Sequence, residues 1–422
     1  MRPGRRSPRS SRSNIARRAR LVIMGGAALA LGCAPAATRT RAAPAPVEPV
    51  RRAMAGGIDE RLPALLDSVM AVGISERAAP GGSVAVGRYG QYALMRGYGR
   101  TDWATDAPAV DDRTIYDLAS LTKVVVTTTA AMILEEEGRL HLDRTVASYL
   151  PEFNDSAKAA ITVRMLLTHR GGLEAYGPLF STARGRAEYL TAINSRPLRY
   201  PPGERSIYSD WDMILLQLVI ERITLQSLDI FARERITGPL GMTDSFFNPD
   251  SAVLSRVAPT ELQTSTGKLI HGVVHDENAR AIGGVSGHAG FFSSARDLAI
   301  FAQMMLNGGH YGSVRILRPT TVARWTSRQD ADTSRALGWD TPSGRSSAGR
   351  YFSPRSFGHT GFTGTSIWID PVKDLYVVLL TNRVNPTRQN SRVFQLRRDV
   401  ADAVQWAVMD APLVEWEGTR VW

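Results

Sequence analysis

Apolar residues recur at a helical spacing through the middle of the chain and at a strand spacing towards both ends. Repeats of three to four residues predict helices over 58–72, 121–137, 162–169, 212–224, 228–236 and 392–408. Apolar runs bounded by turn residues predict strands over 83–86, 92–98, 358–360, 365–370 and 375–381. This order predicts an α+β fold, with an antiparallel sheet built from both chain ends and flanked by helices.

The helical middle of the chain, roughly residues 120–285, is expected to form a second lobe beside this sheet. Pockets commonly form in the cleft between two lobes, so candidate chemistry is expected there. The sequence contains no internal repeat and no second linker. Residues 56–410 are therefore interpreted as one domain, followed by a tail over 411–422.

Residues 1–32 have the organisation of an export signal. Eight arginines form a basic head, and Leu21–Gly32 is an apolar core of twelve residues, too short for a comfortable membrane span. The core ends at Cys33, in a sequence that resembles the lipobox of bacterial lipoproteins except for Ala30, where leucine is usual. We expect Cys33 to be lipidated, with simple cleavage of the signal as the alternative. Residues 33–55, rich in Ala, Pro and Thr, are interpreted as a flexible tether.

The excess of positive charge lies mainly in this signal. The chain carries a formal net charge of +11, and without the eight arginines of residues 1–32 the charge is +3. A nearly balanced body gives no reason to expect a nucleic-acid partner. The single cysteine excludes an intramolecular disulfide. The protein is expected to be exported, either to the periplasm or to a membrane through its lipid anchor.

The helix over 121–137 begins beside a serine. Ser120 is a favoured residue at a helix start, and Lys123 lies three residues later, so the two side chains share a face. A hydroxyl becomes a strong nucleophile beside a base. A neutral lysine amine is such a base where burial or positive neighbours lower its pKa. The free N–H groups of a helix start also suit a developing oxyanion.

The Ser-x-x-Lys spacing alone does not separate a nucleophile from a structural helix cap. A second instance, Ser265–Lys268, lies in a polar stretch with a glycine and is interpreted as a surface turn. Only four of the 51 basic residues are lysines, and arginine cannot be a general base because it stays protonated in proteins. The position of one of these few lysines at the start of an apolar helix favours Ser120 as a nucleophile. A structural helix N-cap remains the alternative.

Histidines and acidic residues elsewhere form weaker patterns. His169 ends a short predicted helix, where a histidine is more often a capping or core residue. A second group lies close together in the sequence: His271, His275, Asp276, Glu277 and His288. Its spacing matches no pattern of metal ligands. We interpret these residues as walls or loops of the cleft, and we expect neither a metal nor a cofactor.

Three short motifs occur in order along the chain, at Ser120–Lys123, Tyr208–Asp210 and His359–Gly361. With these motifs the chain resembles the serine β-lactamase and penicillin-binding-protein superfamily, in particular the β-lactamase-related serine hydrolases near class C enzymes. In the family the three motifs are Ser-x-x-Lys, Tyr-x-Asn and Lys-Thr-Gly. The resemblance extends from about residue 58 to 408, and it implies a β-lactamase/transpeptidase-like fold.

The resemblance also implies an acyl-enzyme mechanism. Ser120 would attack an ester or amide carbonyl, and Lys123 and Tyr208 would share proton transfer. The oxyanion hole would consist of the backbone amides of Ser120 and Phe362. Four residues would contact the substrate: Asp210, His359, Thr360 and Gly361. Without the resemblance, Tyr208 is by default a core aromatic.

Two residues depart from the family pattern. Asp210 replaces an asparagine with a group that only accepts hydrogen bonds when ionised. Its charge would disfavour carbonyl oxygens there, or instead raise the pKa of Lys123. His359 replaces a lysine and removes a fixed positive charge near the carboxylate of β-lactams and D-Ala-D-Ala peptides. Both changes favour neutral esters over substrates that carry a carboxylate.

The sequence therefore predicts an enzyme, an esterase-like serine hydrolase whose substrate is a small-molecule ester. β-Lactamase or D-alanyl-D-alanine carboxypeptidase activity, on a β-lactam or a cell-wall peptide, is the first alternative. Non-catalytic binding of cell-wall peptides is the second. The presence of Ser120, Lys123 and Tyr208 together argues against a structural protein with vestigial motifs.

Lipidation predicts where the protein is found in a fractionated cell. The wild-type chain should sediment with membranes, and Cys33→Ser should release it, because the substitution removes the residue that carries the lipid. Immunoblots of membrane and soluble fractions measure this. A wild-type chain found wholly in the soluble fraction would contradict the lipobox interpretation.

Overall fold

The computed structural model describes residues 53–344 and 346–415. The predicted signal, Cys33 and most of the predicted tether lie outside the described residues. The last part of that tether is a strand instead, since β1 (Ala53–Met54) pairs with β2 (Ile58–Asp59).

An antiparallel sheet of five strands is built from both ends of the described chain, as predicted. The strand order is β12-β13-β14-β3-β4. The strands are β3 (Gly81–Arg88), β4 (Gln91–Gly99), β12 (Phe357–Thr360), β13 (Ser366–Asp370) and β14 (Leu375–Thr381). Seven residue pairs join β14 to β3, so the two ends of the chain share the centre of one sheet.

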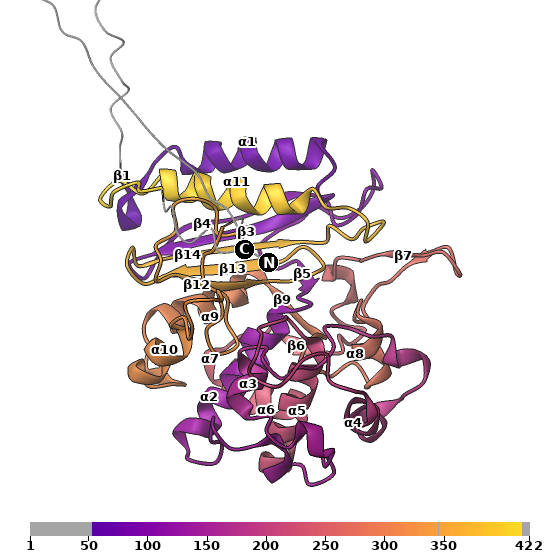
Figure 1. Cartoon of the computed structure of the whole chain (residues 1–422). Helices are drawn as coiled ribbons and strands as arrows, with labels where there is room; N and C mark the ends of the chain where they lie inside the picture. Colours follow the sequence, from indigo (N-terminus) through magenta and orange to yellow (C-terminus); the bar gives the residue numbers. More distant parts are fainter. Residues whose placement is uncertain (1–52, 345, 416–422) are drawn as a thin grey trace, which may run out of the picture. The chain divides into compact units, whose positions relative to one another are not determined.

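Helices cover both faces of this sheet. On one face α1 (Leu62–Ser75) lies beside α11 (Val393–Trp406), so the first and last long helices form one layer (Figure 1). On the other face α9 (Ala295–Leu306) packs against β14 and β3, between the sheet and the helical part of the chain.

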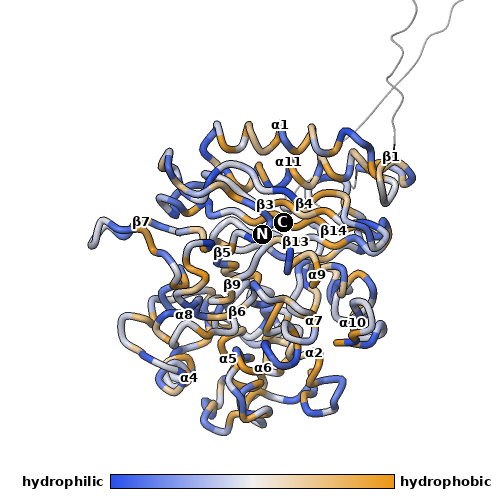
Figure 2. The backbone as a smooth tube through the Cα atoms, turned by 180° about the vertical axis from the view of Figure 1, so that it is seen from behind, coloured by the Kyte–Doolittle hydropathy of each residue, from blue (hydrophilic) through white to orange (hydrophobic). Residues whose placement is uncertain are grey.

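Burial on two faces explains why the central strands are apolar throughout. Side chains alternate between the faces of a strand. In β3, Val84 and Val86 belong to the core under α1 and α11, whereas Ala85 belongs to the larger core on the α9 side. Figure 2 shows the same concentration of apolar residues along the sheet, with hydrophilic positions mainly in the outer loops.

The helical lobe follows the predicted middle of the chain. Its helices are α2 (Thr129–Glu136), α3 (Val163–Leu167), α4 (Gly185–Ser195), α5 (Asp210–Thr224), α6 (Leu228–Ala232), α7 (Gly238–Leu240) and α8 (Glu277–Ala281). Two π-helical turns, Lys123–Thr128 and Arg233–Thr237, are continuous with α2 and α6. The helices predicted over 121–137, 162–169, 212–224 and 228–236 are thus confirmed within a few residues.

Several elements were not predicted. A small sheet of order β5-β9-β6 is formed by β5 (Ile115–Asp117), β9 (Phe291–Ser294) and β6 (Phe246–Phe247). Further unpredicted elements include α4, α7, α8, α9, α10 (Pro319–Thr326) and the hairpins β7 (Leu262–Gln263)–β8 (Lys268–Leu269) and β10 (His310–Tyr311)–β11 (Val314–Arg315). Strands of two residues have too few positions to show a period.

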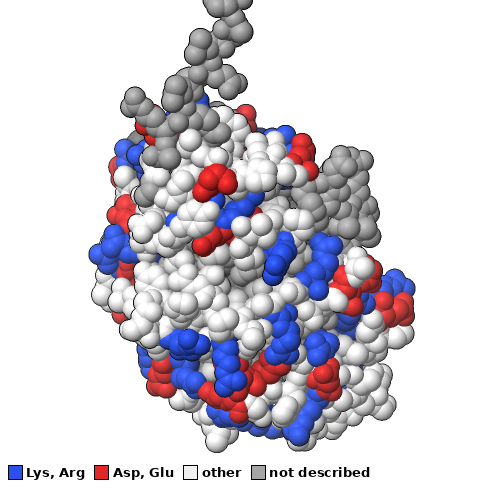
Figure 3. Space-filling view, turned by 90° about the vertical axis from the view of Figure 1, so that its left-hand side faces the viewer, with Lys and Arg blue, Asp and Glu red and all other residues white. Residues whose placement is uncertain are grey.

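On the face drawn in Figure 3, basic and acidic side chains are interspersed, and no large patch carries charges of one sign only. Within residues 53–344 and 346–415, none of the helices combines the length and the apolar character needed to cross a bilayer.

Candidate active site

Ser120 lies in a tight turn that follows β5. The turn is held by Asp117, whose Oδ1 accepts a hydrogen bond from the amide of Ala119 over 2.8 Å. Ala119 has φ +46°, a left-handed conformation that residues with a side chain rarely adopt. Such strain is typical of functional turns, and here it presents Ser120 at the start of the helical segment.

Lys123 is buried and forms three polar contacts. Its Nζ lies 2.8 Å from Ser120 Oγ, 3.0 Å from the carbonyl oxygen of His288 and 2.8 Å from Asp210 Oδ1. The predicted proximity of Ser120 and Lys123 is therefore present. Lys123 opens a π-helical turn, a local irregularity that is frequent at functional sites.

The charge state of Lys123 differs from the simplest expectation for a base. Burial alone lowers the pKa of Lys123, but the charge of Asp210 and the Tyr208 phenol raise it, and the net shift is upward. Lys123 is thus an ammonium in the free enzyme and donates to Ser120. Of the two effects considered for Asp210, raising the pKa of Lys123 is the one that the geometry supports.

Tyr208 stands beside Lys123, in the segment that leads into α5. Lys123 Nζ lies 4.8 Å from the centre of the Tyr208 ring, and His169 and His359 flank the ring at centroid distances of 4.7 and 5.8 Å. Burial raises the pKa of the Tyr208 phenol, Lys123 lowers it, and the net shift is upward. The phenol is therefore neutral at pH 7 and able to donate a proton.

The two amides proposed for the oxyanion hole lie on segments that are tied together. The hydroxyls of Thr363 and Thr365 donate to the carbonyl oxygens of Asp117 and Leu118, over 2.6 and 2.9 Å. The turn after β12, which carries Phe362, is thereby fixed to the turn that carries Ser120. Two oriented N–H donors would each contribute on the order of 3 kcal/mol to transition-state stabilisation.

The third motif, His359–Gly361, lies at the end of the edge strand β12. His359 Nδ1 donates to the carbonyl oxygen of Thr360 over 2.8 Å. Burial lowers the pKa of His359 well below its usual value, and the charges of Arg335 and Lys123 lower it further. His359 is therefore neutral, as the sequence predicted, and Thr360 and Gly361 follow it along the same wall.

Two cavities meet at Ser120, which lines both. We call the first the arginine cavity. It has a volume of about 290 Å³ and is lined by Ser120, Tyr208, Arg335, Asp340, His359, Thr360, Gly361, Phe362, Arg383, Phe394 and Arg397. Its lining contains three arginines and one carboxylate. The sequence analysis missed these arginines, because 47 arginines in the chain give no signal for any one of them.

We call the second the carboxylate cavity. Its volume is about 340 Å³, and its lining includes Asp210, His275, Asp276, Glu277 and His288. The predicted group of histidines and acids thus forms a wall of the cleft. His271 is the exception, because its ring contacts the carbonyl oxygens of Leu254 and Val257 instead.

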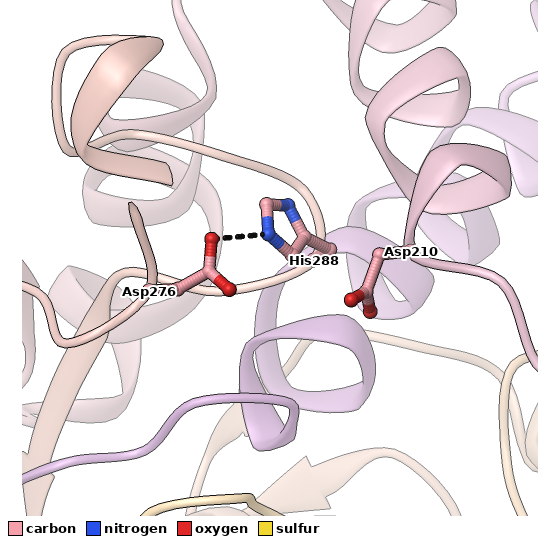
Figure 4. Close-up of side chains that lie close together, drawn as sticks. All are labelled: Asp210, Asp276 and His288. Carbon is pink, nitrogen blue, oxygen red and sulfur yellow. Dashed lines mark hydrogen bonds and ion pairs between the residues drawn. The ribbon is translucent and has the colours of Figure 1, made fainter. Parts of the chain in front are cut away.

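Three residues of this wall come close enough to suggest a metal site. Asp210, Asp276 and His288 each place a ligand atom within 4.8 Å of the others (Figure 4). However, Lys123 pairs with Asp210, and His288 Nε2 lies 2.9 Å from Asp276 Oδ1. A cation there would compete with the Lys123 ammonium. The expectation that the site holds no metal stays a prediction.

The surface turn predicted for the second Ser-x-x-Lys is confirmed. Ser265 is exposed between β7 and β8, and Lys268 is exposed as well. Neither residue lines the two cavities at Ser120.

Comparisons with known proteins agree with this arrangement. The sequence model described as Beta-lactamase matches residues 53–402. A relative from Escherichia coli (strain K12), named "Putative D-alanyl-D-alanine carboxypeptidase", is 39% identical over 318 residues, which cover 67% of this chain and 73% of the relative. The chain belongs to the β-lactamase family. A relative of the same name from Salmonella agona is 38% identical over 312 residues, covering 66% of this chain and 72% of the relative.

Solved structures share the fold of this β-lactamase family protein. EstCE1, described as a hydrolase with promiscuous acyltransferase activity, has a TM-score of 0.67 at 23% identity, covering 82% of this chain and 99% of its own. A class C β-lactamase has a TM-score of 0.67 at 17% identity, with coverages of 81% and 95%. The fold is β-lactamase/transpeptidase-like, as predicted, and the protein is a serine hydrolase.

An activated Ser120 predicts selective covalent labelling. A fluorophosphonate probe should modify Ser120, because a hydroxyl beside a proton-transfer group reacts and ordinary serines do not. Mass spectrometry of the labelled peptides locates the adduct. Ser120→Ala should abolish labelling and Ser265→Ala should not change it; label retained in Ser120→Ala would refute the assignment.

The Lys123–Asp210 pair predicts a shift in the pH profile. If the neutral amine of Lys123 is the base, its raised pKa delays the increase of kcat/KM with pH. Asp210→Asn removes the carboxylate that raises this pKa, so the increase should begin at lower pH. Stopped assays with p-nitrophenyl acetate across the pH range measure it.

Lys123→Arg is the control for that experiment. It keeps the positive charge but cannot release a proton, so we expect a loss of roughly 100-fold or more at every pH. An Asp210→Asn profile that coincides with the wild-type profile would show that another group sets the pH dependence.

Proposed function

We propose that the protein is a D-alanyl-D-alanine carboxypeptidase of the cell wall. In this proposal the terminal carboxylate of the peptide binds in the arginine cavity, and the acyl part lies in the carboxylate cavity. The observation that carries the proposal is the excess of positive charge beside Ser120. The names of the relatives from Escherichia coli and Salmonella point to the same substrate class.

Arg335 is the residue best placed to meet a carboxylate. Its guanidinium lies 5.2 Å from the centre of the Tyr208 ring. Among the described residues, Asp340 is its one ion-pair partner, at a long 3.9 Å. Asp340 Oδ1 also accepts hydrogen bonds from Ser334 and Thr341, so Arg335 keeps most of its capacity for a bidentate contact.

Arg383 and Arg397 add positive charge to the cavity. Neither forms an ion pair with a carboxylate among the described residues. Arg383 donates to the carbonyl oxygens of Phe362, Arg388 and Asn390. Arg397 donates to those of Gly361 and Thr365. Burial, together with the charge of Arg383, lowers the pKa of Arg397 to about 9, so it still carries its charge at neutral pH. A bound carboxylate would relieve the repulsion between the two guanidinium groups.

These arginines change the expectation drawn from motif three. The replacement of a lysine by His359 does remove a fixed charge there, since His359 is neutral. A substrate carboxylate can nevertheless gain binding energy, because other segments of the chain supply positive charge to the same cavity. Ester hydrolysis uses the same nucleophile and requires no carboxylate.

The chemistry follows from the contacts of Ser120. In the fraction of enzyme whose Lys123 has released its proton to solvent, Ser120 Oγ forms a bond to the carbonyl carbon of the penultimate D-alanine while the hydroxyl proton passes to the neutral amine of Lys123. The amides of Ser120 and Phe362 receive the oxyanion. The C–N bond then breaks, the leaving D-alanine takes up a proton from Lys123 or Tyr208, and water hydrolyses the acyl-enzyme. Export through the signal over 1–32 would bring the enzyme to this substrate.

The proposal predicts a preference for a free C-terminal carboxylate. A tripeptide ending in D-Ala-D-Ala should be cleaved at least about 10-fold more efficiently than the same peptide with a C-terminal amide, because charge-assisted bidentate bonds stabilise the carboxylate. Release of D-alanine or D-alaninamide, followed by chromatography, gives kcat/KM for each.

Arg335→Met should reduce that preference while leaving hydrolysis of neutral p-nitrophenyl acetate nearly unchanged. Arg315→Met, which removes an exposed arginine on β11, is the matched control and should change neither. Efficient ester hydrolysis with no cleavage of either peptide would contradict the proposal and favour the esterase. Rapid turnover of nitrocefin would favour a β-lactamase.

A further inference from the structure

Two buried groups behind Tyr208, His169 and Asp212, take no part in the chemistry described so far. Their side chains are each 1% exposed, and His169 Nδ1 lies 3.2 Å from Asp212 Oδ2. The ring of His169 packs against that of Tyr208 with centroids 4.7 Å apart. The pair therefore supports the residue that stands beside Lys123.

The backbone fixes where the proton of this pair lies. The amide of Ser209 donates a hydrogen bond to His169 Nδ1 over 3.2 Å. That nitrogen is therefore an acceptor and carries no hydrogen. The contact between Asp212 and the same nitrogen is a hydrogen bond only if Asp212 is protonated, since a carboxylate would face a lone pair.

The surroundings favour the same assignment. Burial raises the pKa of Asp212 well above its usual value, and Asp210 raises it further. Burial lowers the pKa of His169, with the charges of Arg335 and Lys123 adding to the effect. Asp212 Oδ1 has no hydrogen-bond partner among the described residues, which a neutral carbonyl oxygen tolerates far better than a buried charge.

The backbone is shaped to hold this pair in place. His169 has φ +55°, and its carbonyl oxygen accepts the amide of Ile207 over 2.9 Å. A Cβ on Gly171 would lie 2.5 Å from Asp212 Oδ1, so only glycine leaves room for the carboxyl group there. Strain of this kind persists where the surrounding structure requires it.

We propose that His169 and Asp212 form an electrically neutral, hydrogen-bonded pair that positions Tyr208 for the activation of Ser120. The protonated carboxyl of Asp212 donates a hydrogen bond to His169 Nδ1 and keeps its proton, and the His169 ring supports the Tyr208 ring. Both are positioning residues rather than catalytic ones. The inference concerns activation of the nucleophile and is independent of the natural substrate.

Nitrogen NMR tests the protonation directly on the native protein. In a sample labelled with ¹⁵N-histidine, the signals of His169 are assigned by comparison with His169→Gln. We expect Nδ1 to show the shift of an unprotonated acceptor from about pH 5 to about pH 8, the range in which an ordinary histidine titrates. A protonated Nδ1 would overturn the proposal.

Variants of Asp212 test the positioning role through the rate of fluorophosphonate labelling at Ser120. Asp212→Asn keeps a donor to Nδ1, so the rate should stay within about 3-fold of wild type. Asp212→Leu has a similar volume and no donor, so the rate should fall roughly 100-fold through misplacement of Tyr208. If Asp212→Leu does not fold, the asparagine variant and the NMR result still decide.

Asp297→Leu is the matched control. Asp297 is also buried, and it accepts hydrogen bonds from the amide of Asp244 and the hydroxyl of Ser245, away from the site. This variant should lower the melting temperature without changing the labelling rate of the folded protein. Asp212→Asn as slow as Asp212→Leu, or Asp212→Leu at the native rate, would overturn the proposal.

Discussion

A buried ammonium group needs hydrogen-bond or ion-pair partners on several sides. At Lys123 this requirement brings separate segments of the chain together at the site. The three partners of Lys123 come from the turn before the helix, the start of α5 and the loop before β9. Burying an unpaired charge costs folding free energy. The contacts between these segments therefore stabilise the fold in addition to arranging the site. The same contacts that satisfy the ammonium place it against the nucleophile.

A second constraint joins the two lobes. The turn carrying Ser120 follows β5 of the small sheet, and the turn carrying Phe362 follows β12 of the large sheet. Thr363 and Thr365 bridge them through hydroxyl-to-carbonyl hydrogen bonds. The two amides proposed for the oxyanion hole are therefore held by side chains that line neither cavity at Ser120, so the proposed mechanism needs little reorganisation during the reaction.

The sequence predicted the large sheet and its covering helices because their apolar patterns are long, as in β14 and α11. It placed Ser120, Lys123, Tyr208 and His359 through motif order. It could not predict Arg335 or Arg397, since nothing local separates them from the other arginines. The local sequence could not predict the neutral state of Asp212 either, because this state depends on an amide three residues away and a histidine 43 residues away. Long-range electrostatics decides these features.

The position of Arg397 on α11 has a consequence for biosynthesis. Its guanidinium donates to the carbonyl oxygens of Gly361 and Thr365, on either side of the turn that carries Phe362. A ribosome-bound chain that lacks α11 has no such restraint, and β14 must also find β3 across almost 300 residues of sequence. Contacts between distant segments form late in folding. The turn is therefore restrained only after α11 has been synthesised and packed, when the strands and helices that precede it have already emerged from the ribosome.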